Sequence, residues 1–214
     1  MKHVLFRGAC TALVTPFLKG QVNYPMLEQL LRRQMDAGIE AVVISGTTGE
    51  SPTLSDAEKL ELFCRAKRYA GDNCRIIAGT GSNCTEHTVA LSKAAEASGV
   101  DGLLVVSPYY NKATPEGLVT HYSAVAAAVH IPIMIYNVPS RTGVDIAPST
   151  YAALADHPMI QAIKEASGNL SKVAETAHLV GDKLDIYSGN DDQIIPILSL
   201  GGAGVISVLS NPMP

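Results

Sequence analysis

Short apolar runs alternate along this chain with longer stretches in which apolar residues recur every three or four positions. The short runs are rich in Val, Ile and Leu, which is typical of buried strands, whereas the longer stretches have the spacing of helices with one buried face. The predicted strands lie in the runs ACTALVTPF, AVVISG, RIIAGTG, GLLVVSPYY, PIMIYNVP, IQAIKEA, LDIYSG and AGVISV. A helical stretch follows nearly every one of them.

Helix-capping residues mark where several of these helical stretches begin. Ser55 is followed three residues later by Glu58, which predicts a capping box at the start of one helix. Pro at the first position of a helix and Gly after its last position mark further helix boundaries. The other predicted helices are Pro25–Ala37, a helix through Lys93 that ends at Gly99, a helix from Pro115 behind a Thr114 N-cap, Pro148–Ala155, Leu170–Val180 and Asp191–Leu200.

Strands that are apolar on both faces and are separated by helices predict an α/β fold with a parallel sheet covered by helices. A doubly wound open sheet would bind a nucleotide, but neither G-x-G-x-x-G after the first strand nor G-x-x-x-x-G-K-[ST] occurs. The repetition of the strand-helix unit instead favours a closed (β/α)8 TIM barrel, whose active site lies at the C-terminal ends of the strands.

The chain ends at SVLSNPMP, shortly after the eighth predicted strand. A barrel of typical size, about 250 residues, would add a covering helix after that strand. We therefore expect one barrel domain over residues 1–214, truncated after the eighth strand, with its C-terminal helical region missing.

The amino-acid composition limits the kinds of partner and the cellular location to be expected. The 214 residues are 47% hydrophobic with a formal net charge of -4, and no basic cluster is interleaved with aromatic residues, which argues against nucleic-acid binding. The four cysteines form no C-x-x-C pair, so neither a disulfide framework nor a zinc site is predicted. The N-terminal run MKHVLFRGAC is too short in apolar residues for a signal peptide, and no run of eighteen apolar residues occurs. We expect a cytoplasmic protein with small-molecule partners, without membrane contact.

Polar residues cluster where the predicted strands give way to loops. They are Thr47, Thr48, Glu50, Tyr109, Tyr110, Tyr136, Asn137, Arg141, Lys164 and Glu165, and the barrel geometry predicts that they converge. A lysine partly removed from water there loses its proton more readily, and its amine can attack a ketone to form a Schiff base. Tyr136 would then transfer protons, and the hydroxyls and backbone amides of GTTGES would hold a carboxylate.

Each of these residues also has an ordinary structural interpretation. Lys164 could be a strand-end lysine that extends to solvent, and Tyr136 a barrel residue whose hydroxyl is satisfied by a neighbour. Arg141 could pair with a surface carboxylate, and GTTGES alone is a turn. The six histidines show no metal-ligand spacing.

Taken together, five motifs resemble those of the pyruvate-dependent Schiff-base aldolase and lyase family. They are GTTGES at 46–51, YY at 109–110, YNVPSRTG at 136–143, IKEASGN at 163–169 and GVISV at 204–208. The resemblance extends over essentially the whole chain. It implies that Lys164 forms a Schiff base with pyruvate, whose enamine condenses with L-aspartate 4-semialdehyde to give 4-hydroxy-tetrahydrodipicolinate, the committed step toward diaminopimelate and lysine.

The resemblance also assigns roles by position. It implies that Tyr136 transfers protons with Thr47 and Tyr110 as relay partners. Because Tyr110 is supplied by a neighbouring subunit, the resemblance also implies at least a dimer, and a tetramer for the full-length chain. Pyruvate binding is implied for Thr48, recognition of the semialdehyde carboxylate for Arg141, and backbone contacts to the substrates for Gly189 and Ile206. No metal or other cofactor is implied beyond the covalent lysine.

Alternatives within and outside the family stay open. N-acetylneuraminate lyases and keto-deoxy sugar acid aldolases share the lysine chemistry but recognise substrate hydroxyl groups. Arg141 instead favours a second substrate that carries a carboxylate. A phosphate-binding sugar isomerase barrel and a catalytically dead barrel that acts as a binding module are the other candidates. Feedback-sensitive members bind lysine with imidazole groups and a carboxylate, and the matching positions here are Asp56, Lys59 and His87. We therefore expect weak or absent inhibition by lysine.

Overall fold

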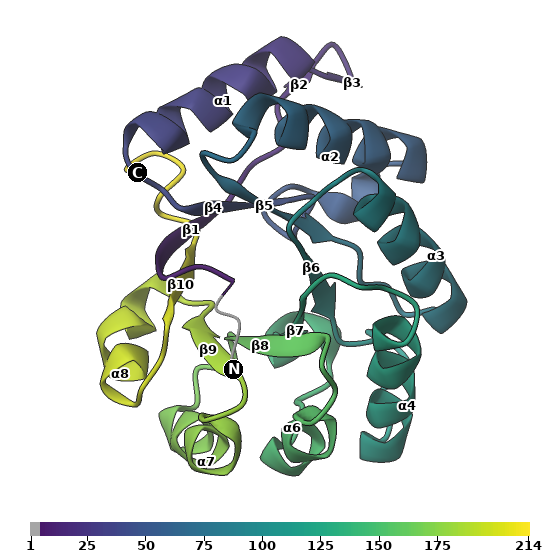
Figure 1. The fold of residues 1–214 in the computed structure, drawn as a ribbon, viewed down its shortest axis with the longest axis vertical. Coiled ribbons are helices and arrows are strands. Elements are labelled where there is room, and N and C mark those ends of the chain that lie inside the picture. Colours follow the sequence, from purple (N-terminus) through teal and green to yellow (C-terminus); the bar gives the residue numbers. More distant parts are fainter. Residues whose placement is uncertain (1–4) are drawn as a thin grey trace.

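Eight parallel strands close into a barrel in the computed structural model, which describes residues 5–214. The first four residues of the N-terminal run considered above lie outside this range. The strands are β1 Gly8–Ala12, β4 Ala41–Ile44, β5 Arg75–Gly79, β6 Gly102–Val106, β7 Ile133–Asn137, β8 Ile160–Glu165, β9 Asp185–Ser188 and β10 Gly204–Ser207. Because β1 pairs in parallel with both β10 and β4, the sheet has no edge, and the predicted TIM barrel is confirmed. Figure 1 shows the ring of strands viewed from one end.

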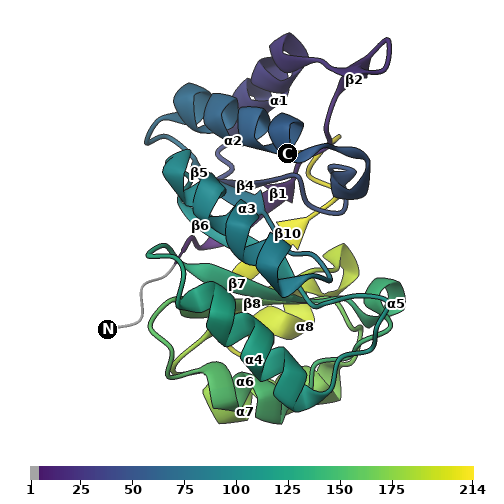
Figure 2. The same cartoon turned by 90° about the vertical axis from the view of Figure 1, so that its right-hand side faces the viewer.

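The helices lie outside the ring of strands (Figures 1 and 2). They are α1 Tyr24–Asp36, α2 Asp56–Ala70, α3 Thr85–Ala97, α4 Pro115–Ala126, α6 Pro148–Leu154, α7 Leu170–Val180 and α8 Ile194–Ser199. The capping box before α2 is present, since the Ser55 side chain accepts from the Glu58 amide while the Glu58 carboxylate accepts from the Ser55 amide. Thr114 likewise caps α4 by accepting from Gly117 N.

The strands separate two hydrophobic layers because successive side chains on a strand point to opposite faces. One layer fills the space between strands and helices and includes Ile133, Ile135 and Ile163. The other fills the barrel interior and includes Met134, Tyr136 and Ala162 together with Ile206. This alternation decides which strand-end residues face the interior.

Short elements were not predicted, and one predicted helix is interrupted. A hairpin of β2 Phe17–Leu18 and β3 Gln21–Val22 follows the first strand, which ends at Ala12 rather than running to Phe17. The short helices η1 Ser51–Thr53 and α5 Pro139–Thr142 lie in loops. Elements of two to four residues cover at most about one period of a strand or helix pattern, so hydrophobic spacing cannot identify them.

The predicted helix Asp191–Leu200 is instead η2 Asp191–Gln193 followed by α8. The Asp191 carboxylate accepts hydrogen bonds from the backbone amides of Val208 and Leu209, at 3.1 and 3.0 Å. The first turn of this segment is thereby tied to the loop after β10.

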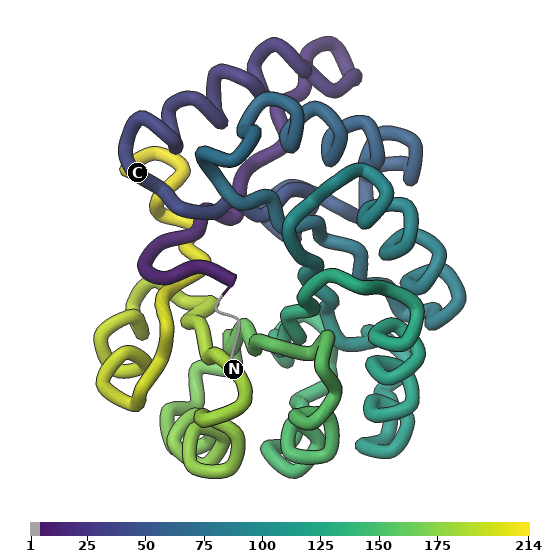
Figure 3. The backbone as a smooth tube through the Cα atoms, viewed as in Figure 1, coloured from purple at the N-terminus to yellow at the C-terminus, as the bar shows by residue number. Residues whose placement is uncertain are grey.

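Residues 208–214, after β10, form bends and turns that pack beside α1 (Figure 3). Gln34 Nε2 donates to Ser210 O at 3.0 Å, and Arg33 Nη1 donates to Asn211 O at 3.0 Å. The Asn211 side chain in turn accepts from Val14 N and donates to Ala12 O, so this segment is joined to the loop after β1.

Candidate active site

Lys164 and Tyr136 lie side by side near the C-terminal ends of β8 and β7. The two residues are partners in the parallel ladder, and both side chains point into the barrel. Lys164 is 5% exposed, and its Nζ lies 4.4 Å from the centroid of the Tyr136 ring. The structure therefore brings together the amine and the phenol that the sequence singled out.

Burial controls the acid-base properties of this pair. Desolvation lowers the pKa of Lys164 to about 8, while Cys10 and Asp191 oppose the shift and the Arg141 guanidinium adds to it. Burial also raises the pKa of Tyr136, with the Thr47 side chain and Arg141 acting in the opposite direction. At neutral pH the site thus holds a protonated phenol beside a lysine that is close to losing its proton.

Cys10 is a neighbour of Lys164 that sequence reasoning missed. It lies on β1 with no exposed surface and belongs to the interior layer. Desolvation raises the pKa of its thiol, and the nearby Lys164 opposes this shift. Alternation along the first strand is the signal that could have placed it in the barrel interior.

Gly189 lies against the stem of Lys164. A Cβ at this position would come 2.7 Å from Ala166 Cβ and 3.1 Å from Lys164 Cε, which is too close for an unaltered neighbour. Its backbone N–H donates to Glu165 O at 2.7 Å. Ile206, from β10, is completely buried in the interior layer.

A cavity of about 480 Å³ opens beside this pair. Thr47, Tyr109, Tyr136 and Arg141 line it, so loops after β4, β6 and β7 contribute to one site. Lys164 is not among the lining residues, and Tyr136 is therefore the link between the cavity and the buried amine. Thr48 and Ile206 do not line the cavity either.

The GTTGES loop after β4 has a constrained backbone. Ser45 and Glu50 adopt positive φ angles of 57°, which are uncommon for residues other than glycine. Gly49 O accepts from Thr15 Oγ1 at 2.6 Å, and a Cβ on Gly49 would lie 3.0 Å from Leu13 O. The loop is thus held against the segment after β1, with Thr47 exposed and Thr48 half-buried.

Tyr110 does not join the site within one chain. It is 87% exposed, and its backbone has a positive φ of 77°. Its amide donates to Thr142 O at 3.3 Å, which ties this loop to the end of α5.

The expected convergence is wrong for Asn137 and Glu165. Each directly follows an interior residue on its strand, so its side chain points outward, toward the helices. There Asn137 Nδ2 donates to Glu165 Oε1 at 3.0 Å. The prediction treated all strand-end residues alike and did not apply the alternation of a strand.

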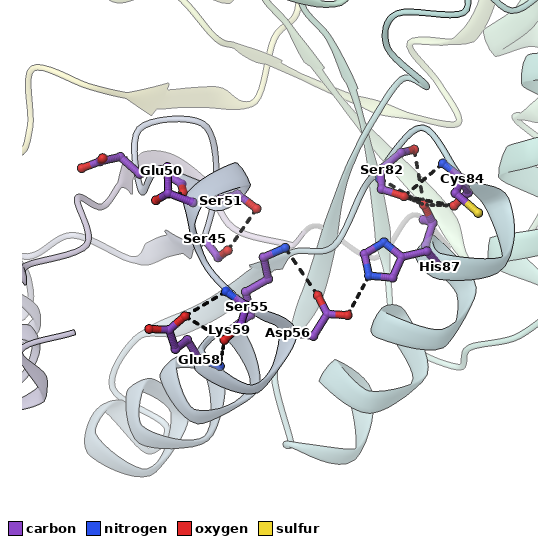
Figure 4. A network of polar contacts seen from close by, with 12 residues as sticks. Ser45, Glu50, Ser51, Ser55, Asp56, Glu58, Lys59, Ser82, Cys84 and His87 are labelled. Carbon is purple, nitrogen blue, oxygen red and sulfur yellow. Dashed lines mark hydrogen bonds and ion pairs between the residues drawn. The ribbon is translucent and has the colours of Figure 1, made fainter. Parts of the chain in front are cut away.

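Lys59 and His87 line the same cavity, and both contact Asp56 (Figure 4). The Asp56 carboxylate lies between Lys59 and His87, with Nζ 3.6 Å from Oδ1 and Nε2 2.7 Å from Oδ2. Chiefly through the hydrogen bond to His87, the pKa of Asp56 is lowered. Lys59 is buried, so the ammonium group is held at the wall of the cavity.

A metal-ligand cluster and a membrane-spanning helix are both absent from residues 5–214. This part of the chain holds no group of three or more His, Cys, Asp or Glu side chains arranged to bind a metal ion. Nor does it contain a helix with the length and apolar character needed to cross a membrane.

Known proteins resemble this chain over nearly its whole length. The profile of the dihydrodipicolinate synthetase family matches residues 5–214. The 4-hydroxy-tetrahydrodipicolinate synthase of Clostridium novyi (strain NT) is 49% identical over 210 residues, which cover 98% of this chain and 71% of that protein.

Solved structures agree. The dihydrodipicolinate synthase of Aquifex aeolicus superposes with a TM-score of 0.96 at 43% identity, over 98% of this chain and 72% of that one. A chloride-inhibited dihydrodipicolinate synthase from Acinetobacter baumannii, complexed with pyruvate, gives a TM-score of 0.94 at 42% identity, over 96% and 71%. Since the profile, the relative and the folds all agree, this chain belongs to the dihydrodipicolinate synthetase family of enzymes.

Proposed function

We propose that this chain condenses pyruvate with L-aspartate 4-semialdehyde through a Schiff base on Lys164. The observation that carries the proposal is a buried lysine, with a pKa of about 8, held 4.4 Å from the ring of Tyr136 at the C-terminal end of the barrel. The pyruvate complex of the Acinetobacter baumannii relative supports the choice of keto acid.

The chemistry uses the amine as a nucleophile and then as an electron sink. Lys164 Nζ attacks the keto carbon of pyruvate, a C–N bond forms, and the keto oxygen leaves as water. The iminium acidifies the pyruvate methyl group, whose proton passes to a base through Tyr136. The resulting enamine forms a C–C bond with the aldehyde carbon, which regenerates the iminium, while the aldehyde C=O π bond opens and its oxygen takes up a proton to become a hydroxyl group. Attack of the semialdehyde amine on the iminium carbon closes the ring and frees Lys164.

The remaining site residues have binding and relay roles in this proposal. Thr48 holds the pyruvate carboxylate, and Arg141 binds the semialdehyde carboxylate by a charge-assisted contact at the cavity. Gly189 and Ile206 offer backbone groups to the substrates. Thr47 passes protons from Tyr136 to Tyr110 of a second copy, so the working form is a homo-oligomer. No metal or other cofactor takes part.

The test is a turnover assay with purified chain and a panel of aldehydes. Pyruvate consumption should require L-aspartate 4-semialdehyde, and N-acetylmannosamine and sugar-acid aldehydes should leave pyruvate unchanged. Faster turnover with a polyhydroxylated aldehyde would assign the site to a sugar-acid aldolase instead. Lys164→Ala is the matched control and should show no turnover with any aldehyde.

A further inference from the structure

A buried polar cluster lies behind the barrel wall at the strand pair that carries Tyr136 and Lys164. The ladder pairs Tyr136 with Lys164 and, one residue later, Asn137 with Glu165. The first pair faces the interior, and the second therefore faces the helices. Asn137 is 0% exposed and Glu165 is 3% exposed, so neither group exchanges its partners for water.

The hydrogen bonds fix the orientation of the Asn137 amide. Its Nδ2 donates to Glu165 Oε1 and to Asp145 Oδ1, both at 3.0 Å, while its Oδ1 accepts from Ile146 N at 3.1 Å. Both N–H donors of the amide are thus used. The opposite orientation would set its carbonyl oxygen against two carboxylates, so this arrangement has no equivalent alternative.

Glu165 connects the cluster to the loop after β8. Its Oε1 also accepts from Ser167 N at 2.8 Å, and Lys172 of α7 pairs with Asp145. Burial raises the pKa of Glu165, while the bonds from Ser167, the charge of Lys172 and the bond from Asn137 oppose the shift. A buried carboxylate that lost these partners would be left unsatisfied, which is costly in a low-dielectric interior.

The backbone ladder is irregular immediately before this point. Ile133 pairs with Ile160 but Met134 pairs with Ala162, so β8 bulges by one residue at Gln161. A slip of one residue on a strand exchanges its two faces, and here it would replace Lys164 by Glu165 in the interior. A side-chain contact that is satisfied in only one register resolves this ambiguity.

We propose that Asn137 and Glu165 are positioning residues, whose buried hydrogen bond sets the register of β7 against β8 and so holds the Tyr136 ring beside the Lys164 amine. The inference rests on the function proposed above. The Asn137–Glu165 pair acts through geometry and not through charge. Besides burial, the groups that shift the pKa of Lys164 are Cys10, Asp191 and Arg141, and neither member of the pair is among them. Misplacing the proton-transfer group should slow turnover without preventing imine formation.

The experiment compares Glu165→Gln, Asn137→Ala and the double variant with the parent chain. Glu165→Gln is nearly isosteric and leaves one acceptor, so it guards against simple unfolding. Ile163→Val is the matched control, because Ile163 lies on the same strand and face as Glu165 but is apolar. Lys164 is labelled with pyruvate and borohydride to count sites, and kcat for the condensation is expressed per labelled site.

We expect Asn137→Ala to lose kcat per labelled site by about 10- to 100-fold, the range for a small displacement of a catalytic group. Glu165→Gln should stay near the parent value, because its amide oxygen can still accept from both Asn137 Nδ2 and Ser167 N. The KM for pyruvate and the pH midpoint of labelling should stay at the parent values. The double variant should be no slower than the worse single one, because the pair acts as a unit. Ile163→Val should retain the parent kcat per labelled site.

Unchanged kcat per labelled site in Asn137→Ala would overturn the positioning role while leaving the proposed function intact. A shifted pH midpoint at unchanged kcat would overturn it too, because it would indicate an electrostatic role. If the parent chain itself takes no label, the proposed function fails and this inference fails with it.

Discussion

The acid-base behaviour of Lys164 is set by where its side chain lies. A surface lysine has a pKa near 10.4, so fewer than about one amine in a thousand is neutral at pH 7. Burial brings the pKa of Lys164 to about 8, which leaves roughly one in ten neutral at that pH. The Tyr136 ring beside it supplies a phenol that stays protonated, because its own pKa is raised.

Imine formation with pyruvate should therefore follow the titration of Lys164. The neutral amine is the nucleophile, so the trapping rate should rise about tenfold from pH 6 to pH 7 and level off above pH 8. Initial rates of borohydride trapping across pH 5.5–9.5, with borohydride reactivity controlled on a free amine, give the profile. A midpoint near 10 would show that the amine is not desolvated.

Arg141 is expected to act on the second substrate rather than on the first. Arg141 is exposed and lines the cavity, whereas Lys164 is buried and does not line it. Arg141→Ala should lower kcat/KM for the semialdehyde by about 10- to 100-fold, the loss typical of a charged hydrogen bond, and should lower pyruvate trapping far less. Equal losses in both assays would contradict this assignment.

Lysine should inhibit this chain weakly or not at all. The ammonium of Lys59 lies at the cavity wall, where it repels a cationic effector, and the Asp56 carboxylate is already shared with His87. Activity measured across lysine concentrations should stay near its uninhibited value, and Lys59→Met, which removes the like charge, should increase sensitivity. Strong inhibition of the parent at low lysine concentration would refute the prediction.

At the scale of elements, hydrophobic periodicity predicts the long, regular strands and helices. The eight barrel strands and the long helices were found because apolar spacing repeats over several turns or pleats, and Ser55 and Thr114 marked helix starts by their chemistry. The hairpin after β1 and the short helix α5 depend on local loop geometry and on contacts between distant segments. The interrupted helix at η2 and α8 has such a contact, in which Asp191 accepts hydrogen bonds from the amides of Val208 and Leu209.

The candidate site was predicted as a set of residues but not as an arrangement. Strand ends identified Lys164 and Tyr136, whereas the outward direction of Asn137 and Glu165 follows from the alternation of a strand, which the prediction did not apply. The bulge in β8 is a feature that no local pattern reveals. The proximity of Cys10 required knowing how the barrel closes.

The close packing of β9 against β8 can be tested at Gly189. Gly189→Ala would place a Cβ 2.7 Å from Ala166 Cβ and 3.1 Å from Lys164 Cε, so the amine must move. We expect a stability loss of about 1–3 kcal/mol by thermal unfolding and slower trapping of pyruvate. Gly117→Ala is the control, since its Cβ would lie 3.5 Å from the Thr114 hydroxyl, and it should trap normally. Parent-like trapping in Gly189→Ala would show that this contact does not hold the amine.

At the scale of the whole molecule, the exposed Tyr110 bears on assembly. Tyr110 is 87% exposed, has a positive φ and does not line the cavity of its own chain. If Tyr110 completes the relay of a partner subunit, Tyr110→Phe and Lys164→Ala subunits should each be poorly active alone. In a mixture of equal amounts, random pairing makes half of the dimers hybrids, and each hybrid has one site with both residues intact, so about a quarter of all sites should be active. Recovery is measured after the two variants are dissociated and reassembled together. No recovery in a mixture proven to contain hybrids would place Tyr110 in its own site.

The most direct measurement is the intact mass and peptide map of the chain after reaction with pyruvate and borohydride. A covalent lysine mechanism predicts one reduced pyruvate adduct per chain, located on the peptide that contains Lys164 and absent from Lys164→Ala. An unmodified chain, or an adduct spread over surface lysines and unaffected by Lys164→Ala, would contradict the role of this buried amine.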